Sequence, residues 1–210
     1  MATKHLRPPG RILEIGPGQG GIALLARDAG WAYSAVEPSA VLASQLRARG
    51  FDVIEAFTPP IPVPDASQDV LYADQVLEHM SGIDAARALV AEARRVLRPG
   101  GLFFVVVPDY LKERGFFWDI DYTHNFITTE RRVRQLMHDG GFDVVEMVRS
   151  IGLATGLQRD ILAGASDPAV PVAVVSHDEF KELSAGAAAI VRTGECTPYH
   201  NAVLVAGVSF

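Results

Sequence analysis

The sequence has few of the features that mark a secreted, membrane-spanning or thiolate-metal protein. Cys196 is the only cysteine, so neither an internal disulfide nor a multi-thiolate metal site can form within the chain. The longest apolar run, Leu102 to Val107, is far too short to cross a bilayer, and Met1 to Pro9 lacks the apolar centre of a signal peptide. We therefore expect a soluble, cytoplasmic protein without a membrane span.

Positive charge is also scarce. The formal net charge is −6, and the densest basic cluster, formed by Arg131, Arg132 and Arg134, is typical of a solvated helix face. A protein that holds a nucleic-acid backbone usually presents a broad basic surface, so we expect no nucleic-acid partner. The length of 210 residues and the 49% content of hydrophobic residues suit a single globular domain with a full core.

Short apolar segments alternate with segments of helical periodicity. The predicted strands are residues 11–15, 33–36, 52–57, 69–73 and 102–107, followed later by 142–149 and 202–209. The predicted helices are residues 22–29, 40–49, 84–97 and 128–139. Strands separated by helices predict a parallel sheet with right-handed crossovers. Residues 58–65 contain four prolines and are predicted to form an ordered loop.

A glycine-rich loop, residues 16–21, follows the first predicted strand, and Glu37 follows the second. Glycines allow a tight turn and a close approach of the backbone to a ligand, and a carboxylate in the position of Glu37 can accept hydrogen bonds from ribose hydroxyls. The alternative is a purely structural role, in which the glycine loop is a simple turn and Glu37 caps the next helix. The loop also satisfies the G-x-G-x-x-G spacing of dinucleotide enzymes, so this pair of features does not choose between a nicotinamide and a sulfonium cofactor.

Further segments resemble the class I methyltransferases, specifically the type 11 and type 23 groups that act on small molecules. The matching segments are residues 13–20 (Leu-Glu-Ile-Gly-Pro-Gly-Gln-Gly), 36–39 (Val-Glu-Pro-Ser), 62–70, 74–80 (Asp-Gln-Val-Leu-Glu-His-Met), 92–101 (ending Leu-Arg-Pro-Gly-Gly) and 121–126 (Asp-Tyr-Thr-His-Asn-Phe). The resemblance implies an α/β, Rossmann-like, doubly wound and mostly parallel seven-stranded sheet with an antiparallel C-terminal strand and helices on both faces.

The resemblance also implies S-adenosylmethionine as cofactor, with S-adenosylhomocysteine as product. The aminoacyl end of the cofactor would lie against the loop after Glu14, the ribose against Glu37, and the adenine beside residues 56–57. The implied cofactor-binding residues are Glu14, Gly16, Pro17, Gly18, Gln19, Gly20, Glu37, Pro38, Ala56, Phe57, Asp74 and Gln75. Two positions depart from the family pattern: the usual acidic residue near the adenine is not evident in Glu55-Ala56-Phe57, and Gln68 replaces a usual aromatic residue.

Two histidines are candidate catalytic groups for a small-molecule acceptor. A hydroxyl acceptor must lose a proton, and neutral imidazole is available near pH 7. His79 lies in the Leu-Glu-His segment, and His124 lies in a segment rich in aromatic residues. Either residue could instead only fix the loop that carries it. We expect O-methylation in preference to N- or C-methylation, and no metal site, because the sequence reveals no cluster of carboxylates.

Residues 1–210 are predicted to form one methyltransferase domain, in which residues 109–127 and 151–197 are substrate-side or interface insertions. An Ala-rich stretch before Cys196 includes a predicted helix at residues 179–191 and makes a homodimer plausible. Two other functions are compatible with the sequence: a nicotinamide-dependent oxidoreductase, and a catalytically silent protein that binds the cofactor and a protein partner.

Overall fold

A central β-sheet organises the computed structural model, which describes residues 9–151 and 201–209. The strands are β1 (Arg11–Ile15), β2 (Ala32–Val36), β3 (Asp52–Ile54), β4 (Gln68–Asp74), β5 (Leu97–Pro108), β6 (Phe142–Ile151) and β7 (Asn201–Ser209). Their order is β3-β2-β1-β4-β5-β7-β6. The first five pair in parallel, which confirms the predicted doubly wound α/β core, whereas β7 runs antiparallel to both β5 and β6.

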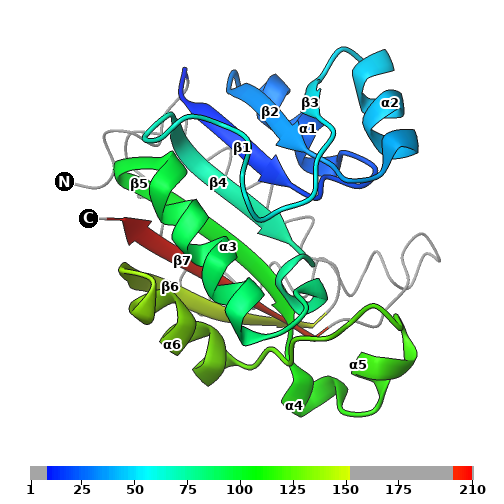
Figure 1. Ribbon diagram of the computed structural model, residues 1–210, viewed down its shortest axis with the longest axis vertical. Coiled ribbons are helices and arrows are strands. Elements are labelled where there is room, and N and C mark those ends of the chain that lie inside the picture. The colour runs from blue at the N-terminus through cyan, green and yellow to red at the C-terminus, as the bar shows by residue number, and fades with distance from the viewer. Residues whose placement is uncertain (1–8, 152–200, 210) are drawn as a thin grey trace.

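Helices cover both faces of the parallel core. The longer helices are α1 (Gly21–Asp28), α2 (Ala40–Ala48), α3 (Ile83–Val96) and α6 (Glu130–Asp139). Neighbouring residues of β2 point to opposite faces: Ala35 packs with residues of α1 and α2, and Val36 belongs to the larger core that α3 and α6 line. Figure 1 shows α3 and α6 in front of the sheet.

The order of the strands indicates where a ligand crevice lies. The chain winds outward from β1 in both directions, through β2 and β3 on one side and through β4 and β5 on the other. Crossovers therefore diverge between β1 and β4, and ligands of open parallel sheets bind beyond the carboxyl ends of the strands at such a point. The glycine loop after β1 and the Leu-Glu-His segment after β4 both lie there.

Strand β3 is shorter than the predicted strand at residues 52–57. Its partner among the described strands, β2, ends at Val36, which pairs with Ile54, so the residues after Ile54 have no described strand to pair with. Conversely, β5 begins earlier than the predicted strand at residues 102–107. Leu97 already pairs with Gln68, and the ladder resumes at Leu102 after an irregularity around the Pro-Gly-Gly turn.

Three short helical segments on the carboxyl side were not predicted. They are the 3₁₀ helix η2 (Leu77–His79) and the helices α4 (Tyr110–Glu113) and α5 (Phe116–Asp119). One or two turns carry too little periodicity to be recognised in a sequence. The expected insertion at residues 151–197 and the expected helix at 179–191 lie almost entirely outside the described residues. None of the helices in residues 9–151 is long and apolar enough to span a membrane.

Candidate functional site

The glycine loop turns away from the end of β1 through three residues with positive φ. Gly16, Gly18 and Gly20 have φ values of 66°, 52° and 75°, which residues with a Cβ rarely adopt. The backbone N–H of Gly16 donates to the carbonyl of Val36 over 2.9 Å, which ties the loop to the end of β2. The positive φ values explain why glycine alternates along this loop.

The remaining predicted loop residues support this turn. The carbonyl of Pro17, a buried residue, accepts a hydrogen bond from the N–H of Gly20 over 2.8 Å. Gln19 is exposed, and its carbonyl accepts a hydrogen bond from Nη1 of Arg49 over 2.6 Å. Through Arg49, the chain that follows α2 braces the outer side of the loop.

Glu37 connects the glycine loop to the start of α2. Its Oε2 accepts a hydrogen bond from the N–H of Gly18 (3.2 Å), and its Oε1 accepts one from the N–H of Ser39 (2.8 Å). The residue is only 4% exposed. Ser39 itself caps α2, because its Oγ accepts from the N–H of Leu42 over 3.4 Å. The carboxylate of Glu37 is therefore held in one orientation at the crevice, and the side chain that caps α2 is that of Ser39.

Glu14 is a buried acid on β1. Its Oε2 accepts a hydrogen bond of 2.5 Å from the hydroxyl of Tyr33 on β2. Burial raises the pKa of Glu14 to about 8, and the hydrogen bond from Tyr33 opposes part of that rise. Burial beside Glu14 likewise raises the pKa of the Tyr33 hydroxyl. Both side chains are therefore protonated at neutral pH, and the pair carries no net charge beneath the glycine loop.

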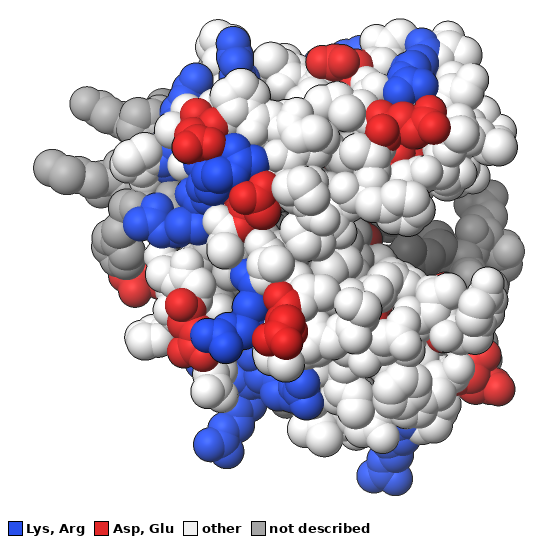
Figure 2. Space-filling model, viewed as in Figure 1, with Lys and Arg blue, Asp and Glu red and all other residues white. Residues whose placement is uncertain are grey.

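A cavity of about 560 Å³ opens at the carboxyl edge of the sheet. Figure 2 shows a hollow on one side of the molecule surrounded mainly by uncharged surface, away from the side where charged groups gather. The lining comes from the ends of β1 and β2, the proline-rich loop, η2 and the start of α3. The lining residues are Ile15, Gly16, Glu37, Pro38, Phe57, Thr58, Pro59, Gln75, Val76, His79, Met80, Ser81 and Ala85.

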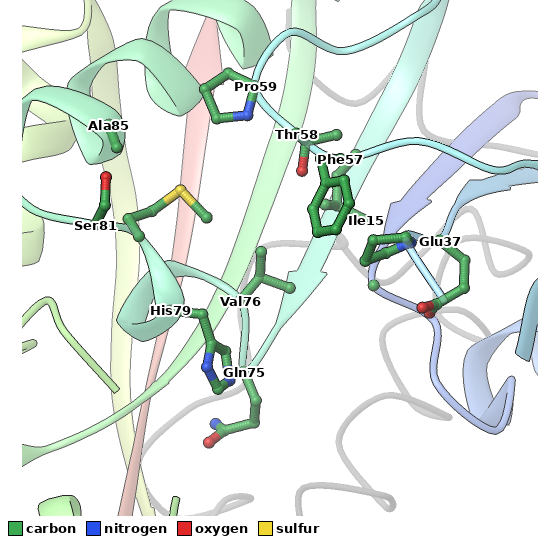
Figure 3. A pocket seen from close by; sticks show the side chains of 13 residues that line it. Ile15, Glu37, Phe57, Thr58, Pro59, Gln75, Val76, His79, Ser81 and Ala85 are labelled. Atoms are coloured by element: carbon green, nitrogen blue, oxygen red, sulfur yellow. The ribbon is translucent and has the colours of Figure 1, made fainter. Parts of the chain in front are cut away.

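Five of the predicted cofactor-binding residues line this cavity, and seven do not. Those that line it are Gly16, Glu37, Pro38, Phe57 and Gln75. Those outside the lining are Glu14, Pro17, Gly18, Gln19, Gly20, Ala56 and Asp74. Sequence reasoning missed seven lining residues, which are Ile15, Thr58, Pro59, Val76, Met80, Ser81 and Ala85. Their positions beside the predicted residues were the only available signal. Figure 3 shows Glu37 and His79 on opposite sides of the cavity.

The segment after β3 places an aromatic side chain at the cavity. Phe57 is 80% exposed and lines the opening, while Ala56 packs against the main core. The carboxylate of Glu55 lies 3.6 Å from Nη1 of Arg47 in an exposed ion pair. Glu55 is not among the lining residues, so the structure places no acid of this segment at the cavity.

Arg95 of α3 holds the proline-rich loop in place. Its guanidinium donates to the carbonyls of Ile61 (2.7 Å) and Val63 (2.9 Å) and to the carboxylates of Asp65 (2.6 Å) and Glu92 (2.8 Å). Glu92 also accepts from the N–H of Ile61 over 2.8 Å. This network anchors the part of the loop that directly follows the cavity-lining residues 57–59.

His79 faces the cavity with a defined tautomer. Oγ1 of Thr123 donates to the carboxylate of Asp121 over 2.7 Å, so the same oxygen accepts from the Nδ1–H of His79 over 2.8 Å. The lone pair of His79 is then on Nε2. Burial and the neighbouring His124 lower the pKa of His79, whereas hydrogen bonds from Thr123 lower the pKa of Asp121. At neutral pH the carboxylate of Asp121 therefore accepts from the hydroxyl of Thr123, which in turn accepts from the neutral imidazole of His79.

His124 lies behind His79 and does not line the cavity. The two rings are 4.9 Å apart between centroids, and Nδ1 of His124 lies 2.6 Å from the carbonyl of Phe117. Glu78, adjacent to them, is completely buried, and neither of its carboxylate oxygens has a hydrogen-bond partner. Burial raises the pKa of Glu78 to about 8. The structure thus brings together the two predicted catalytic histidines and adds a buried acid that sequence reasoning did not single out.

The chain belongs to the methyltransferase domain family. The type 23 methyltransferase domain family matches residues 1–147, which include the glycine loop, the cavity and both histidines. This match confirms the methyltransferase predicted from the motifs. Among solved structures, a SAM-dependent methyltransferase from Archaeoglobus fulgidus is similar, with a TM-score of 0.66, 13% identity, and coverage of 98% of this chain and 88% of that one. A possible histamine N-methyltransferase from Thermotoga maritima has a TM-score of 0.61, 22% identity, and coverage of 100% and 86%.

The C-terminal part of the chain is also similar to a different group of proteins. The RbsD / FucU transport protein family matches residues 124–209, so the two family matches overlap over residues 124–147. D-ribose pyranase from Symbiobacterium thermophilum is 68% identical over 62 residues, which are 30% of this chain and 43% of that protein. The chain spans less than two thirds of the length of the curated D-ribose pyranases that it matches.

Proposed function

We propose that this methyltransferase transfers a methyl group from S-adenosylmethionine to a hydroxyl group of a small molecule. One observation carries the proposal: a single cavity joins the oriented carboxylate of Glu37 to the neutral imidazole of His79. The first group suits an adenosine ribose, and the second suits an acceptor that must lose a proton.

The residues of the crevice fit an adenosine-containing cofactor. Glu37 offers its carboxylate to the two ribose hydroxyls, and the alternate positive φ values of the glycine loop allow close backbone approach. Phe57 is exposed at the opening and is placed to cover the adenine ring. Asp74 and Gln75, at the end of β4, would lie at the methionine end. S-adenosylmethionine supplies a methyl group that its sulfonium has already activated.

The histidines lie on the acceptor side of the cavity. His79 is oriented by Thr123, and its lowered pKa keeps it neutral, so its Nε2 can accept the proton of an acceptor hydroxyl. His124 supports His79 from behind at a centroid distance of 4.9 Å. An amine acceptor that is already neutral would not need this group, and we therefore favour O-methylation.

Calorimetry with S-adenosylhomocysteine tests the cofactor assignment. We expect binding by the intact chain and at least a tenfold higher Kd for Glu37→Gln, which keeps the shape but loses the acceptor charge. Glu55→Gln is the matched control, because Glu55 sits in an exposed ion pair outside the cavity lining, and its Kd should be unchanged. Binding of NAD without binding of S-adenosylhomocysteine would contradict the proposal and favour an oxidoreductase.

We further propose that residues 1–210 form one methyltransferase domain with a seven-stranded sheet, in which residues 109–127 cover the acceptor side. Two residues of this segment contact the candidate catalytic histidines: Thr123 forms a hydrogen bond with His79, and the carbonyl of Phe117 forms one with His124. The homodimer stays a prediction, and sedimentation equilibrium of the intact chain would test it.

The D-ribose pyranase match supports a second candidate activity, in which the C-terminal region acts on D-ribose. The supporting observation is the 68% identity over 62 residues. Exchange between the ring forms of D-ribose can be followed by NMR in the presence of the intact chain. No acceleration over the buffer rate would contradict this second candidate and leave the methyltransferase proposal untouched.

A further inference from the structure

Two distant segments of the chain bring three potential metal ligands together. Glu78 and His79 lie on η2, directly after β4, and His124 lies in the segment after α5. One carboxylate oxygen of Glu78 and one ring nitrogen of each histidine all lie within 4.8 Å of one another. The N–H groups of Asn125 and Phe126 donate to the carbonyl of Glu78 over 2.8 and 2.9 Å, which docks the two segments backbone to backbone. These main-chain hydrogen bonds hold the two ligand-bearing segments next to each other.

The contacts of Nδ1 in both imidazoles favour the tautomer in which Nε2 carries the lone pair and is available to a metal ion. Nδ1–H of His79 donates to Thr123, whose hydroxyl is oriented by Asp121. Nδ1 of His124 lies 2.6 Å from the carbonyl of Phe117, which can only accept, so this nitrogen also carries the proton. Metal-binding histidines commonly donate their second ring nitrogen to a carbonyl or a carboxylate-linked group in this way, because that contact fixes the tautomer and the ring orientation.

Glu78 supplies an independent observation. Its side chain is 0% exposed, yet both carboxylate oxygens lack a hydrogen-bond partner. A buried polar group without a partner is costly, and native structures usually satisfy such groups with protein, water or an ion. The carboxylate oxygens of Glu78 thus need a partner that the surrounding protein atoms do not provide.

We propose that Glu78, His79 and His124 bind one divalent transition-metal ion. The three ligand atoms lie within 4.8 Å of one another, so an ion at the centre of the triangle that they form is at most about 2.8 Å from each atom. Each ligand atom therefore has to move inward by roughly 0.6 Å to reach the usual metal–ligand bond length. Two imidazole nitrogens and one carboxylate suit Zn²⁺ or Fe²⁺, whereas Mg²⁺ and Ca²⁺ prefer sites made of oxygen ligands. The cluster is therefore assigned to Zn²⁺ or Fe²⁺.

The site faces the cavity through His79. His79 lines the cavity, whereas Glu78 and His124 are buried outside the lining, so an ion held by all three would lie beside the cavity, next to His79. A metal ion with open positions can bind a hydroxyl group and lower its pKa. Resting on the methyl transfer of the proposed function, the inference names acceptors with a coordinating hydroxyl as the substrate class. A bound ion would lower the pKa of that hydroxyl, and His79 would act as a metal ligand in place of the proton acceptor that it is in the metal-free protein.

Equilibrium binding of Zn²⁺ to the intact chain, measured by competition with a chromophoric chelator after treatment with EDTA, tests the site. We expect one tight Zn²⁺ per chain and an increase in Kd of at least 100-fold for Glu78→Gln and for His79→Gln, because each loses a ligand. His138→Gln is the matched control: His138 is exposed on α6, and its replacement should leave the Kd unchanged. Co²⁺ should give visible absorption bands in the intact chain, and these should disappear in both ligand variants.

The possible outcomes separate this inference from the proposed function. Absence of stoichiometric Zn²⁺ binding by the intact chain would overturn the metal site, as would equally tight binding by Glu78→Gln, since the ion would then not depend on Glu78. Circular dichroism of each variant shows whether it is folded, and His79→Gln, at a half-buried position, keeps the test valid if Glu78→Gln unfolds. Zn²⁺ binding without S-adenosylhomocysteine binding would support the metal site and contradict the cofactor assignment, whereas the reverse result would overturn the metal site alone.

Discussion

The hydroxyl of Tyr33 donates a 2.5 Å hydrogen bond to Oε2 of Glu14, across the adjacent parallel strands β2 and β1. Both groups are held in their protonated forms by burial, Glu14 with its pKa raised to about 8. The pair lies directly before the glycine loop and keeps an acid uncharged beneath the candidate cofactor site.

We predict that Glu14 makes the protein less stable as the pH rises. An unfolded glutamate loses its proton near pH 4.5, whereas folded Glu14 keeps it until about pH 8. Between these values the folded state binds more protons, so the free energy of unfolding falls by up to about 1.4 kcal/mol per pH unit and levels off above pH 8. Urea unfolding of the intact chain and of Glu14→Gln at pH 5, 6, 7 and 8 measures this. The variant should show a shallower slope, and an unchanged slope would contradict the assigned pKa.

Positive-φ glycines should differ in their tolerance of alanine, both in the cofactor loop (Gly18 and Gly20) and after α2 (Gly50, φ 85°). A Cβ at Gly20 would lie 2.5 Å from Cδ2 of Leu46, a buried side chain, whereas a Cβ at Gly18 or Gly50 would meet nothing within 4 Å. Gly18→Ala and Gly50→Ala should each cost about 1–2 kcal/mol of backbone strain. Gly20→Ala should cost about 1–3 kcal/mol more, because the core around Leu46 must give way. Equal losses of stability for the three alanine variants, measured by thermal or urea unfolding, would contradict the packing described around Gly20.

Arg95 should control the order of the loop beside the cavity. Arg95→Gln removes the guanidinium that reaches two loop carbonyls and leaves the carboxylate of Glu92 without its ion-pair partner. We expect a loss of about 1–3 kcal/mol in stability and a several-fold higher Kd for S-adenosylhomocysteine. Arg87→Gln is the control, since Arg87 is exposed on the same helix, α3. An unchanged Kd with lowered stability would show that the anchor serves the fold and not the cavity.

Thr123 should act as a positioning residue for His79. Thr123→Val keeps the shape but removes both the acceptor for the Nδ1–H of His79 and the donor to Asp121. We expect a 10- to 100-fold higher Kd for Zn²⁺ and an unchanged Kd for S-adenosylhomocysteine. Thr123→Ser restores the hydroxyl and should restore Zn²⁺ affinity. If Thr123→Ser behaves like Thr123→Val, the lost affinity reflects packing of the methyl group, and the positioning role is wrong.

Features within short stretches of sequence could be predicted well. The glycines of residues 16–21 were predicted as a ligand loop, and three of them have positive φ. Glu37 was placed at the end of the second strand, where its carboxylate does meet the loop through Gly18. These predictions depend on local rules, since turn chemistry and the period of a strand are set by neighbouring residues. The same rules missed the early start of β5, because a Pro-Gly-Gly sequence is typical of a turn.

Features that depend on distant segments could not be predicted. The sequence offered both His79 and His124 as candidate catalytic groups, whereas in the structure His79 lines the cavity and His124 lies behind it. Nothing local indicates that Asn125 and Phe126 dock on Glu78, or that Arg95 reaches across to the proline-rich loop. The absence of a carboxylate cluster in the sequence led to the expectation of no metal site, because two histidines and one glutamate from separate segments leave no linear spacing to recognise.

The amino-acid sequence by itself determined the alternation of strands and helices, the glycine turn and the acid that meets it, since each depends on residues a few positions apart. The tertiary structure alone decided which side chains share the cavity and which protons the histidines carry. Those properties follow from the docking of the segment around His124 onto η2, and from burial that no linear pattern records. The chemistry of the acceptor side is therefore a property of the packed molecule.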